Sequence, residues 1–259
     1  EVNKIFLKKT ITDLKKISKS GFYISASYVK KFEDNFAKYN GSKYSIAVAN
    51  GFDALKLSLE AFKILKYCKA GDEVIVPANT YIATILAVSH SNLNPIFAEP
   101  EKKFFTLDPF EIEKRITKKT KVLIVTHLYG HLTQMDKIMS VAKKYNLRII
   151  EDCSQAHGAS FDNQKSGNFG DAGCFSLFPA KNLGALSDAG IITTNNKKVF
   201  KVLSSIRNYG EEIIKNGQEI IKNYGERKYK NIYKGFNSRM SEINASILNE
   251  KLKKLDHHN

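Results

Sequence analysis

A lysine follows a short apolar run in the stretch 173–184, GCFSLFPAKNLG. The run Cys174–Phe178 predicts a buried strand that ends at Pro179, and Lys181 stands on the turn after it. A lysine amine that is held at a strand end and shielded from water can lose its proton and form a Schiff base. The alternative is an ordinary surface-loop lysine, so other residues have to support the chemical interpretation.

The Asn50–Gly51 turn lies between a predicted strand and a helix predicted to begin at Phe52. Free backbone N–H groups and the positive end of a helix dipole at such a junction suit a phosphate. Ser176, five residues before Lys181, can add a hydroxyl to the same anion. The alternatives are a plain strand-to-helix turn and a strand serine bonded to the backbone.

Asp152 is expected at the end of a buried strand, where an ionised carboxylate needs a cationic partner. A protonated pyridine nitrogen would be one such partner, and an arginine elsewhere in the chain is the alternative. Gln155 can hydrogen-bond a phenolate oxygen of the same ring, and Tyr81 can stack on the ring or belong to the core. Together with Lys181 and the phosphate anchor, these residues predict a site for pyridoxal phosphate.

Strands and helices alternate along the chain, which predicts an α/β fold with a mostly parallel sheet and helices on both faces. In such a sheet ligands bind at the carboxyl ends of the strands, where Asp152, Lys181 and the Asn50–Gly51 turn are all expected. The predicted strands are Tyr44–Ala49, Glu73–Val76, Ile96–Ala98, Lys121–Thr126 and Leu147–Ile150, and the predicted helices are Ser25–Tyr39, Phe52–Leu65, Asn79–Ser89, Asp108–Arg115 and Asp136–Tyr145.

The composition bounds the class of protein. A chain of 259 residues with 42% hydrophobic content can form one large α/β domain or two modest ones. We expect neither a membrane span nor a signal peptide, because no apolar run approaches the required length. The three cysteines (Cys68, Cys153 and Cys174) lie far apart, which predicts free thiols, and the absence of CxxC spacing predicts no structural zinc site.

The net charge of +15 raises the possibility of a nucleic-acid partner. Lysine supplies nearly all of this charge and is spread over every segment, whereas the chain has only five arginines. Proteins that read a groove rely on arginine forks. We therefore expect no nucleic-acid partner, and a basic nucleic-acid-binding protein is kept as an alternative.

Seven motifs occur in order and cover nearly the whole chain: NGFDAL (Asn50–Leu55), PANTYIAT (Pro77–Thr84), VTHLYG (Val125–Gly130), EDCSQAHGA (Glu151–Ala159), FSLFPAKNLGALSDAG (Phe175–Gly190), RNYG (Arg207–Gly210) and KGFNSRMSEINASIL (Lys234–Leu248). With these motifs the chain resembles the DegT/DnrJ family of nucleotide-sugar aminotransferases. The resemblance implies the large domain of a type I pyridoxal-phosphate-dependent aminotransferase, with its mostly parallel central sheet. Such long, ordered motifs are far more specific than a single short one.

The resemblance implies a role for each residue around the cofactor ring. Lys181 would bind pyridoxal phosphate as a Schiff base and later move the proton between cofactor and sugar carbons. Asp152 would pair with the pyridine nitrogen, Gln155 would contact the ring oxygen, and Tyr81 would stack on the ring. Lys181 also favours transamination over dehydration, because dehydrating relatives carry histidine at this position.

The resemblance also implies a phosphate site that two subunits share. The backbone amides of Phe52 and Asp53 and the hydroxyl of Ser176 would bind the phosphate. Asn237 resembles the asparagine that reaches the phosphate from the neighbouring subunit, which would make the active unit a homodimer.

The residues of the NGFDAL and PANTYIAT motifs, together with Glu99–Pro100, are similar to those of the family branch that aminates C3 of dTDP-3-keto-6-deoxyhexoses. L-Glutamate would convert the cofactor to pyridoxamine phosphate, and the keto sugar would then take the amine. The alternatives are a C4 aminotransferase acting on a UDP- or dTDP-4-keto sugar and a truncated, inactive protein that only binds the cofactor. Analogy with the family suggests a bacterial cytoplasmic enzyme that serves lipopolysaccharide or other surface glycans.

The resemblance divides the chain into two parts. Residues 1–235 would form the cofactor-binding large domain, and residues 236–259 would begin the helix that leads into a smaller C-terminal domain. We expect most of that domain to be missing, because a helical apolar pattern is still running at Leu255. Residues 212–225 hold a tandem near-repeat, EIIKNGQ and EIIKNYG, which predicts an inserted surface loop or short helix.

Overall fold

A computed structural model describes residues 2–213 and 230–259, apart from the side chains of residues 2–5 and 7. Most of the tandem near-repeat lies outside the described residues. The strands are β1 (Tyr44–Val48), β2 (Glu73–Pro77), β3 (Asn94–Ala98), β4 (Thr120–Thr126), β5 (Arg148–Asp152), β6 (Ser160–Phe161), β7 (Gln164–Lys165), β8 (Ala172–Ser176) and β9 (Gly190–Thr194).

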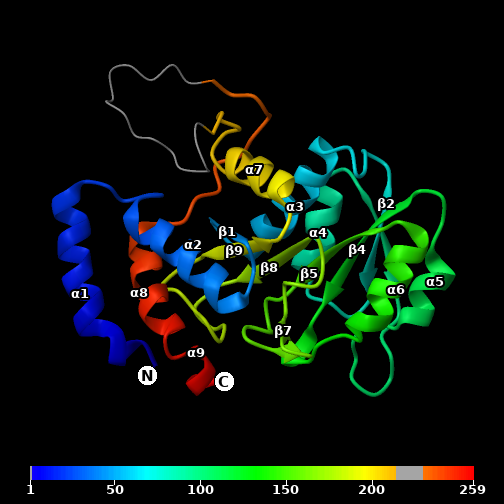
Figure 1. Ribbon diagram of the computed structural model, residues 1–259, viewed down its shortest axis with the longest axis horizontal. Coiled ribbons are helices and arrows are strands. Elements are labelled where there is room, and N and C mark those ends of the chain that lie inside the picture. Colours follow the sequence, from blue (N-terminus) through cyan, green and yellow to red (C-terminus); the bar gives the residue numbers. More distant parts are fainter. Residues whose placement is uncertain (1, 214–229) are drawn as a thin grey trace.

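Seven of these strands form one central sheet in the order β1-β9-β8-β5-β4-β2-β3, and β6 pairs with β7 in a separate hairpin (Figure 1). Within the central sheet only β9 is antiparallel to its neighbours β1 and β8. The other six strands therefore run in one direction and end at the same edge of the sheet. The predicted mostly parallel sheet is confirmed.

Helices cover both faces of the sheet, as predicted, because alternate residues of each buried strand point to opposite faces. In β2, Val74 and Val76 face one helical layer, whereas Ile75 faces the other. The helices are α1 (Val2–Ser20), α2 (Ser27–Asn40), α3 (Gly51–Ile64), α4 (Ile82–His90), α5 (Pro109–Arg115), the 3-10 turn η1 (Leu128–Gly130), α6 (Met135–Tyr145), α7 (Lys197–Ile206), α8 (Glu242–Leu252) and α9 (Leu255–His258). Helices α3, α4 and α7 cover the first face, and α2 with α8 and α5 with α6 cover the two halves of the second.

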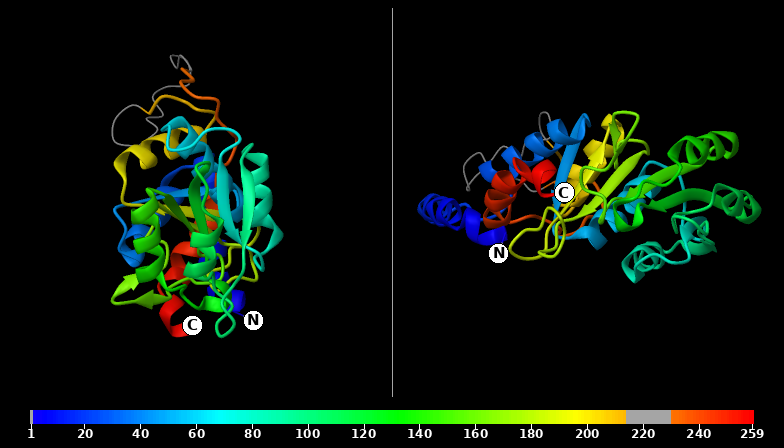
Figure 2. Two further views of the ribbon diagram at one scale, coloured as in Figure 1. Left: turned by 90° about the vertical axis from the view of Figure 1, so that its right-hand side faces the viewer. Right: turned by 90° about the horizontal axis from the view of Figure 1, so that it is seen from below.

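Helix α8 packs in the same core as α2. Leu248 and Leu252 lie among Phe32 and Phe36 of α2, and the carboxylate of Glu242 accepts three backbone N–H groups at the start of α2. Figures 1 and 2 show α1, α2 and α8 together at one end of the long axis and α5 and α6 at the other. The proposed division of the chain at residue 235 stays a prediction.

Two expectations from composition can be compared with the structure. The three cysteines are free, as predicted, and all three are buried. Among the described residues, no helix is both long enough and apolar enough to cross a membrane.

Candidate active site

The sequence-predicted residues gather at one edge of the sheet. Asp152 is the last residue of β5, Lys181 follows β8, and Asn50 follows β1. Tyr81 follows β2 and stands at the N-cap of α4. Because these strands share one direction, their carboxyl ends bring the four positions to the same edge.

Asp152 is a buried carboxylate at the carboxyl end of β5. It is only 5% exposed; its Oδ2 accepts a hydrogen bond from Thr84 Oγ1 at 2.8 Å, and its Oδ1 accepts one from the Ser154 N–H at 3.2 Å. In the part of the chain that the structure describes, no lysine or arginine forms an ion pair with it. The alternative of an arginine partner therefore has no support here, and a buried charge of this kind suits a cationic ligand.

Gln155 and Tyr81 were predicted to meet the cofactor ring, and the structure shows the partners and exposure of each. The Tyr129 backbone N–H donates to Gln155 Oε1 at 2.8 Å. Because that oxygen accepts from the backbone, the Gln155 NH₂ group stays available as a donor. Tyr81 is 72% exposed, and its carbonyl accepts the Thr84 N–H at 3.0 Å. Its ring is therefore available for stacking, close to the residue that contacts Asp152.

The start of α3 is where the sequence predicted a phosphate anchor formed by the amides of Phe52 and Asp53. Asn50 caps this helix, and its side chain accepts the Asp53 N–H at 2.7 Å. The Asp53 amide is thus committed to the cap, whereas helix geometry leaves the Gly51 and Phe52 amides without intrahelical partners. A Cβ added to Gly51 would lie 2.6 Å from Ser176 Cβ. The Ser176 side chain is therefore packed directly against the helix start, as a shared phosphate site requires.

Lys181 lies on a turn closed by its own N–H, which donates to the Phe178 carbonyl at 2.9 Å. His157 lies near this lysine and is buried. Burial lowers the pKa of His157 to about 4, and the charge of Lys181 acts in the same direction. The neutral ring has Nε2 2.9 Å from the Ser176 carbonyl, to which it donates. His157 therefore links the end of β8, close to the lysine, to the loop that carries Gln155.

Asn237 is exposed and lies beside α3 of its own chain. Its neighbour Ser238 donates to Asp53 Oδ2 at 2.7 Å, and Arg239 Nε donates to Asn237 Oδ1 at 3.0 Å. This contact leaves the Asn237 NH₂ group as a donor. No partner chain is present, so the role of Asn237 across a subunit boundary stays a prediction, as do the other site assignments.

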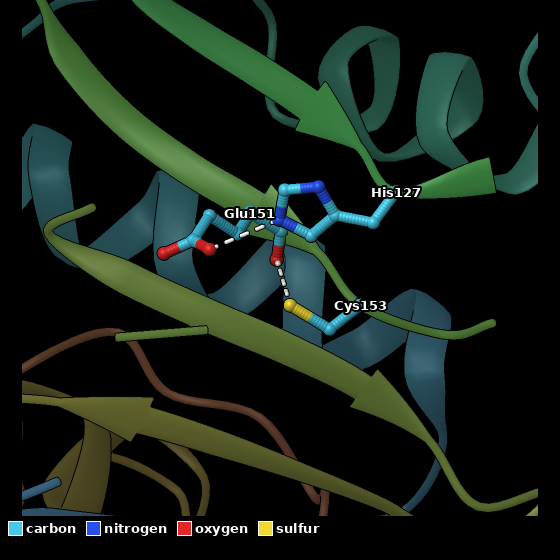
Figure 3. Close-up of side chains that lie close together, drawn as sticks. All are labelled: His127, Glu151 and Cys153. Atoms are coloured by element: carbon cyan, nitrogen blue, oxygen red, sulfur yellow. Dashed lines mark hydrogen bonds and ion pairs between the residues drawn. The ribbon is translucent and has the colours of Figure 1, made fainter. Parts of the chain in front are cut away.

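Three buried groups below the site lie close enough to suggest a metal centre: His127, Glu151 and Cys153 (Figure 3). The Glu151 carboxylate, however, accepts four hydrogen bonds, from His127 Nε2 at 3.0 Å and from the backbone N–H groups of residues 167, 169 and 170 at 2.7–2.8 Å. Burial raises the pKa of the Cys153 thiol well above its ordinary value. Because the Glu151 carboxylate already accepts four hydrogen bonds, it ties the end of β5 to the backbone of residues 167–170 and serves as a structural support.

Two residues of the site were not assigned from the sequence. Thr84 belongs to the PANTYIAT motif and His157 to the EDCSQAHGA motif, so both were within recognised stretches. Their contacts with Asp152 and Ser176 depend on the order of the strands, which residue types alone do not reveal. A signal for Thr84 was its spacing of three residues from Tyr81, which places Thr84 in the first turn of the helix that Tyr81 precedes as N-cap.

Known proteins are similar to this chain in sequence and in fold. A dTDP-3-amino-3,6-dideoxy-alpha-D-galactopyranose transaminase from Aneurinibacillus thermoaerophilus is 45% identical over 259 residues, which are 100% of this chain and 66% of that protein. The solved structure of DesV from S. venezuelae, in complex with a ketimine intermediate, has a TM-score of 0.88 at 35% identity and covers 99% of this chain and 64% of that one. NtdA from Bacillus subtilis, solved with bound cofactor PMP, has a TM-score of 0.83 at 32% identity, covering 97% and 53%. The chain thus spans between half and two thirds of the length of these proteins.

A family profile matches nearly the whole chain. The profile of the DegT/DnrJ/EryC1/StrS aminotransferase family matches residues 5–259. This match includes all seven motifs on which the resemblance rested, and that resemblance is confirmed. The chain belongs to the DegT/DnrJ/EryC1/StrS aminotransferase family.

Proposed function

We propose that this chain is the cofactor-binding part of a pyridoxal-phosphate-dependent aminotransferase. It would transfer the amino group of L-glutamate to C3 of a dTDP-3-keto-6-deoxyhexose. The observation that carries the proposal is Asp152, a buried carboxylate that meets no lysine or arginine among the described side chains and lies at the same sheet edge as Lys181. A protonated pyridine nitrogen is the cation that would complete its environment.

The residues present fit pyridoxal phosphate. The amides of Gly51 and Phe52 and the Ser176 hydroxyl suit the phosphate. The free NH₂ group of Gln155 suits the ring oxygen, and the exposed ring of Tyr81 suits a stacked ring. Each chemical group of the cofactor thereby has a matching protein group at one edge of the sheet.

When bound, pyridoxal phosphate supplies a carbonyl group and an electron-accepting ring. Asp152 would keep a proton on the ring nitrogen by charge pairing, and Gln155 would orient the ring through its oxygen. Lys181 would hold the cofactor covalently and would then use its free amine as the base and acid that moves a proton. The N-terminus of α3 would fix the phosphate and so position the ring over these groups.

The reaction exchanges an amino group for a carbonyl oxygen. L-Glutamate becomes 2-oxoglutarate, and the ketone of the sugar becomes an amine, so the atoms and electrons balance over the two halves. The relative from A. thermoaerophilus, a dTDP-3-amino-3,6-dideoxy-alpha-D-galactopyranose transaminase, supports C3 as the position and dTDP as the nucleotide. The glutamate donor follows from the family, and a cytoplasmic homodimer is part of the same proposal.

The first half of the reaction can be tested on the chain alone. We expect added pyridoxal phosphate to give the absorbance band of a lysine-bound cofactor, and L-glutamate to remove that band. Lys181→Ala should abolish the band. Lys121→Ala, at the amino end of β4 and thus at the opposite edge, should leave it unchanged. Absence of the band in the wild-type chain would contradict cofactor binding by this part of the protein.

The second half requires the sugar. After glutamate treatment, a dTDP-3-keto-6-deoxyhexose should regenerate the lysine-bound band and yield an amino sugar with nitrogen on C3. Nuclear magnetic resonance of the product shows the position of the amine directly. Nitrogen on C4, or turnover only with 4-keto sugars, would overturn the proposed regiochemistry. The proposal that the protein is an aminotransferase would still stand.

A further inference from the structure

We propose that Thr84 is a positioning residue for Asp152. It would act at the head of a chain of three threonine hydroxyls that holds the carboxylate toward the ring nitrogen of the cofactor. The inference rests on the proposed function, because it assigns a purpose to the environment of Asp152. It adds to the site the contact between Thr84 and Asp152 and the chain of threonine hydroxyls behind it. None of these threonines is among the groups that would touch the cofactor.

The chain connects three elements at the sheet edge. Thr84, in the first turn of α4, has its Oγ1 2.8 Å from Asp152 Oδ2. Thr80, in the turn before α4, has its Oγ1 3.0 Å from Thr84 Oγ1 and 3.1 Å from Thr126 Oγ1. Thr126 ends β4, and in the sheet it is the direct partner of Asp152 at the end of β5. The hydroxyls therefore form a continuous path that starts and ends on neighbouring strands.

The Asp152 carboxylate, which accepts the last hydrogen bond of the chain, determines which hydroxyl donates in each of the others. An ionised carboxylate can only accept hydrogen bonds, so the Thr84 hydroxyl donates to Asp152. Thr84 has a single hydroxyl hydrogen, and its oxygen therefore accepts from Thr80, which in turn accepts from Thr126. All three O–H dipoles point toward the carboxylate, and such chains strengthen each of their members.

The geometry also explains how this carboxylate remains buried although it has no lysine or arginine partner among the described residues. Thr84 is fully buried, at 0% exposure, and Thr126 is 5% exposed. Thr84 satisfies one carboxylate oxygen while the Ser154 N–H satisfies the other, so the plane of the carboxylate is fixed from both sides. Thr84 also donates its backbone N–H to Tyr81. One residue thereby ties the predicted pyridine partner to the predicted stacking residue.

The link between the two side chains can be tested without any cofactor. In a double-mutant cycle with Thr84→Val and Asp152→Leu, urea unfolding measures the stability of each variant. We expect Thr84→Val to raise the unfolding equilibrium constant about tenfold in the wild-type background, because a charge-assisted hydrogen bond is lost. In the Asp152→Leu background the same substitution should change it less than about threefold. Equal effects in both backgrounds would overturn the link.

The role toward the cofactor is tested with pyridoxamine phosphate, which forms no Schiff base with Lys181 and so reports non-covalent contacts alone. Thr84→Val should weaken its binding about tenfold, and Thr84→Ser, which keeps the hydroxyl, should remain within about threefold of wild type. The matched control is Thr194→Val. Thr194 is equally buried and its hydroxyl donates to the Asp171 carbonyl at 2.7 Å, but it pairs with Tyr44 at the opposite edge of the sheet; affinity should be unchanged.

The outcomes separate the two proposals. If Thr84→Ser binds as weakly as Thr84→Val, or if Thr84→Val binds like wild type, the hydroxyl does not position Asp152 and the inference is wrong. If the wild-type chain binds no pyridoxamine phosphate, the proposed function and the cofactor role of Thr84 both fail. The double-mutant cycle then still decides whether Thr84 holds the carboxylate.

Discussion

Glu151 and Asp152 are adjacent acids at the end of one strand, and their surroundings differ. Glu151 accepts four hydrogen bonds and has no remaining acceptor site. Asp152 has one donor on each oxygen. Because neighbouring residues of a strand point to opposite faces, Glu151 lies on the face where its hydrogen bonds are all taken, and Asp152 lies on the face where we propose the cofactor. Residue type alone does not distinguish them.

His157 provides a prediction at the scale of one residue. Its pKa falls from 6.5 to about 4 in the fold, mainly through burial. Above pH 6.5 the ring is neutral in both states. As the pH falls toward 4, the unfolded chain takes up a proton that the folded chain does not, so the free energy of unfolding should decrease, by at most about 3 kcal/mol.

His157→Gln removes this proton uptake while keeping a side-chain NH₂ group that can donate to the Ser176 carbonyl. Urea unfolding at pH 7, 5.5 and 4.5 should show a flatter pH dependence for this variant than for wild type. The exposed His257, changed to Gln in the same way, serves as the control and should retain the wild-type slope. If the free energy of unfolding of His157→Gln depends on pH as steeply as that of wild type, another group causes the loss of stability in acid.

The sequence predicted the positions of the candidate residues in the fold better than it predicted their hydrogen-bond partners. Asp152, Lys181 and the Asn50–Gly51 turn could be placed at one edge, because a parallel sheet brings strand ends together. Thr84 and His157 could not be assigned, because their partners lie on strands that are distant in the sequence. The Asn50 side-chain bond to the Asp53 amide was also not foreseen, although asparagine is a common N-cap residue.

At the scale of elements, the predicted strands and helices are present, with shifted ends. The helix predicted from Asn79 begins at Ile82, because the Asn79 side chain donates to the Phe105 carbonyl and Tyr81 is extended. Helix α1, strand β9 and helix α7 had not been predicted. In α1 the buried face includes the polar Thr10 and Asp13, which weakens the apolar periodicity that identifies a helix.

The contact between α3 and β8 gives a prediction at this scale. Gly51→Ala would place a Cβ 2.6 Å from Ser176 Cβ and 2.9 Å from its Cα. Because one of these atoms is backbone, the helix start has to move away from the strand end. We expect a loss of about 1–3 kcal/mol in the free energy of unfolding and roughly tenfold weaker binding of pyridoxamine phosphate.

Gly71→Ala is the matched control for that substitution. Gly71 lies in the turn before β2, at the opposite edge of the sheet, and has φ +82° with no heavy atom near an added Cβ. The substitution should lower the free energy of unfolding by about 1 kcal/mol through backbone strain. The affinity for pyridoxamine phosphate should remain as in wild type. If Gly51→Ala behaves in the same way as this control, the helix start does not bind the phosphate.

At the scale of the whole molecule, the carboxyl edge of the sheet exposes large apolar side chains. Tyr81 is 72% exposed, Tyr129 81%, Phe178 49% and Leu186 45%, and all four follow strands that end at this edge or lie in the segment that carries Lys181. Exposed apolar groups that gather at a ligand site indicate that something covers them. A cofactor, a second subunit and the part of the family members that this chain does not span are all consistent with this surface.

Asn237 distinguishes a site built within one chain from a site shared by two. Ser238 bonds to Asp53 of its own chain, which places Asn237 near its own α3, whereas the family resemblance places it at the neighbouring subunit's phosphate. Lys181→Ala and Asn237→Ala chains can be purified separately, unfolded together and refolded as a mixture. The readout is the lysine-bound absorbance band, at a cofactor concentration where neither parent shows it.

If Asn237 acts across the subunit boundary, each mixed dimer contains one site with both native residues. Random pairing then restores roughly a quarter of the wild-type band. If Asn237 acts within its own chain, every site in the mixture lacks one of the two residues, and no band returns. Co-refolded wild-type chain controls for the yield of refolding, and separation by size shows whether dimers form. Recovery near a quarter therefore requires both the dimer and the shared site, because neither one alone rebuilds a complete set of residues.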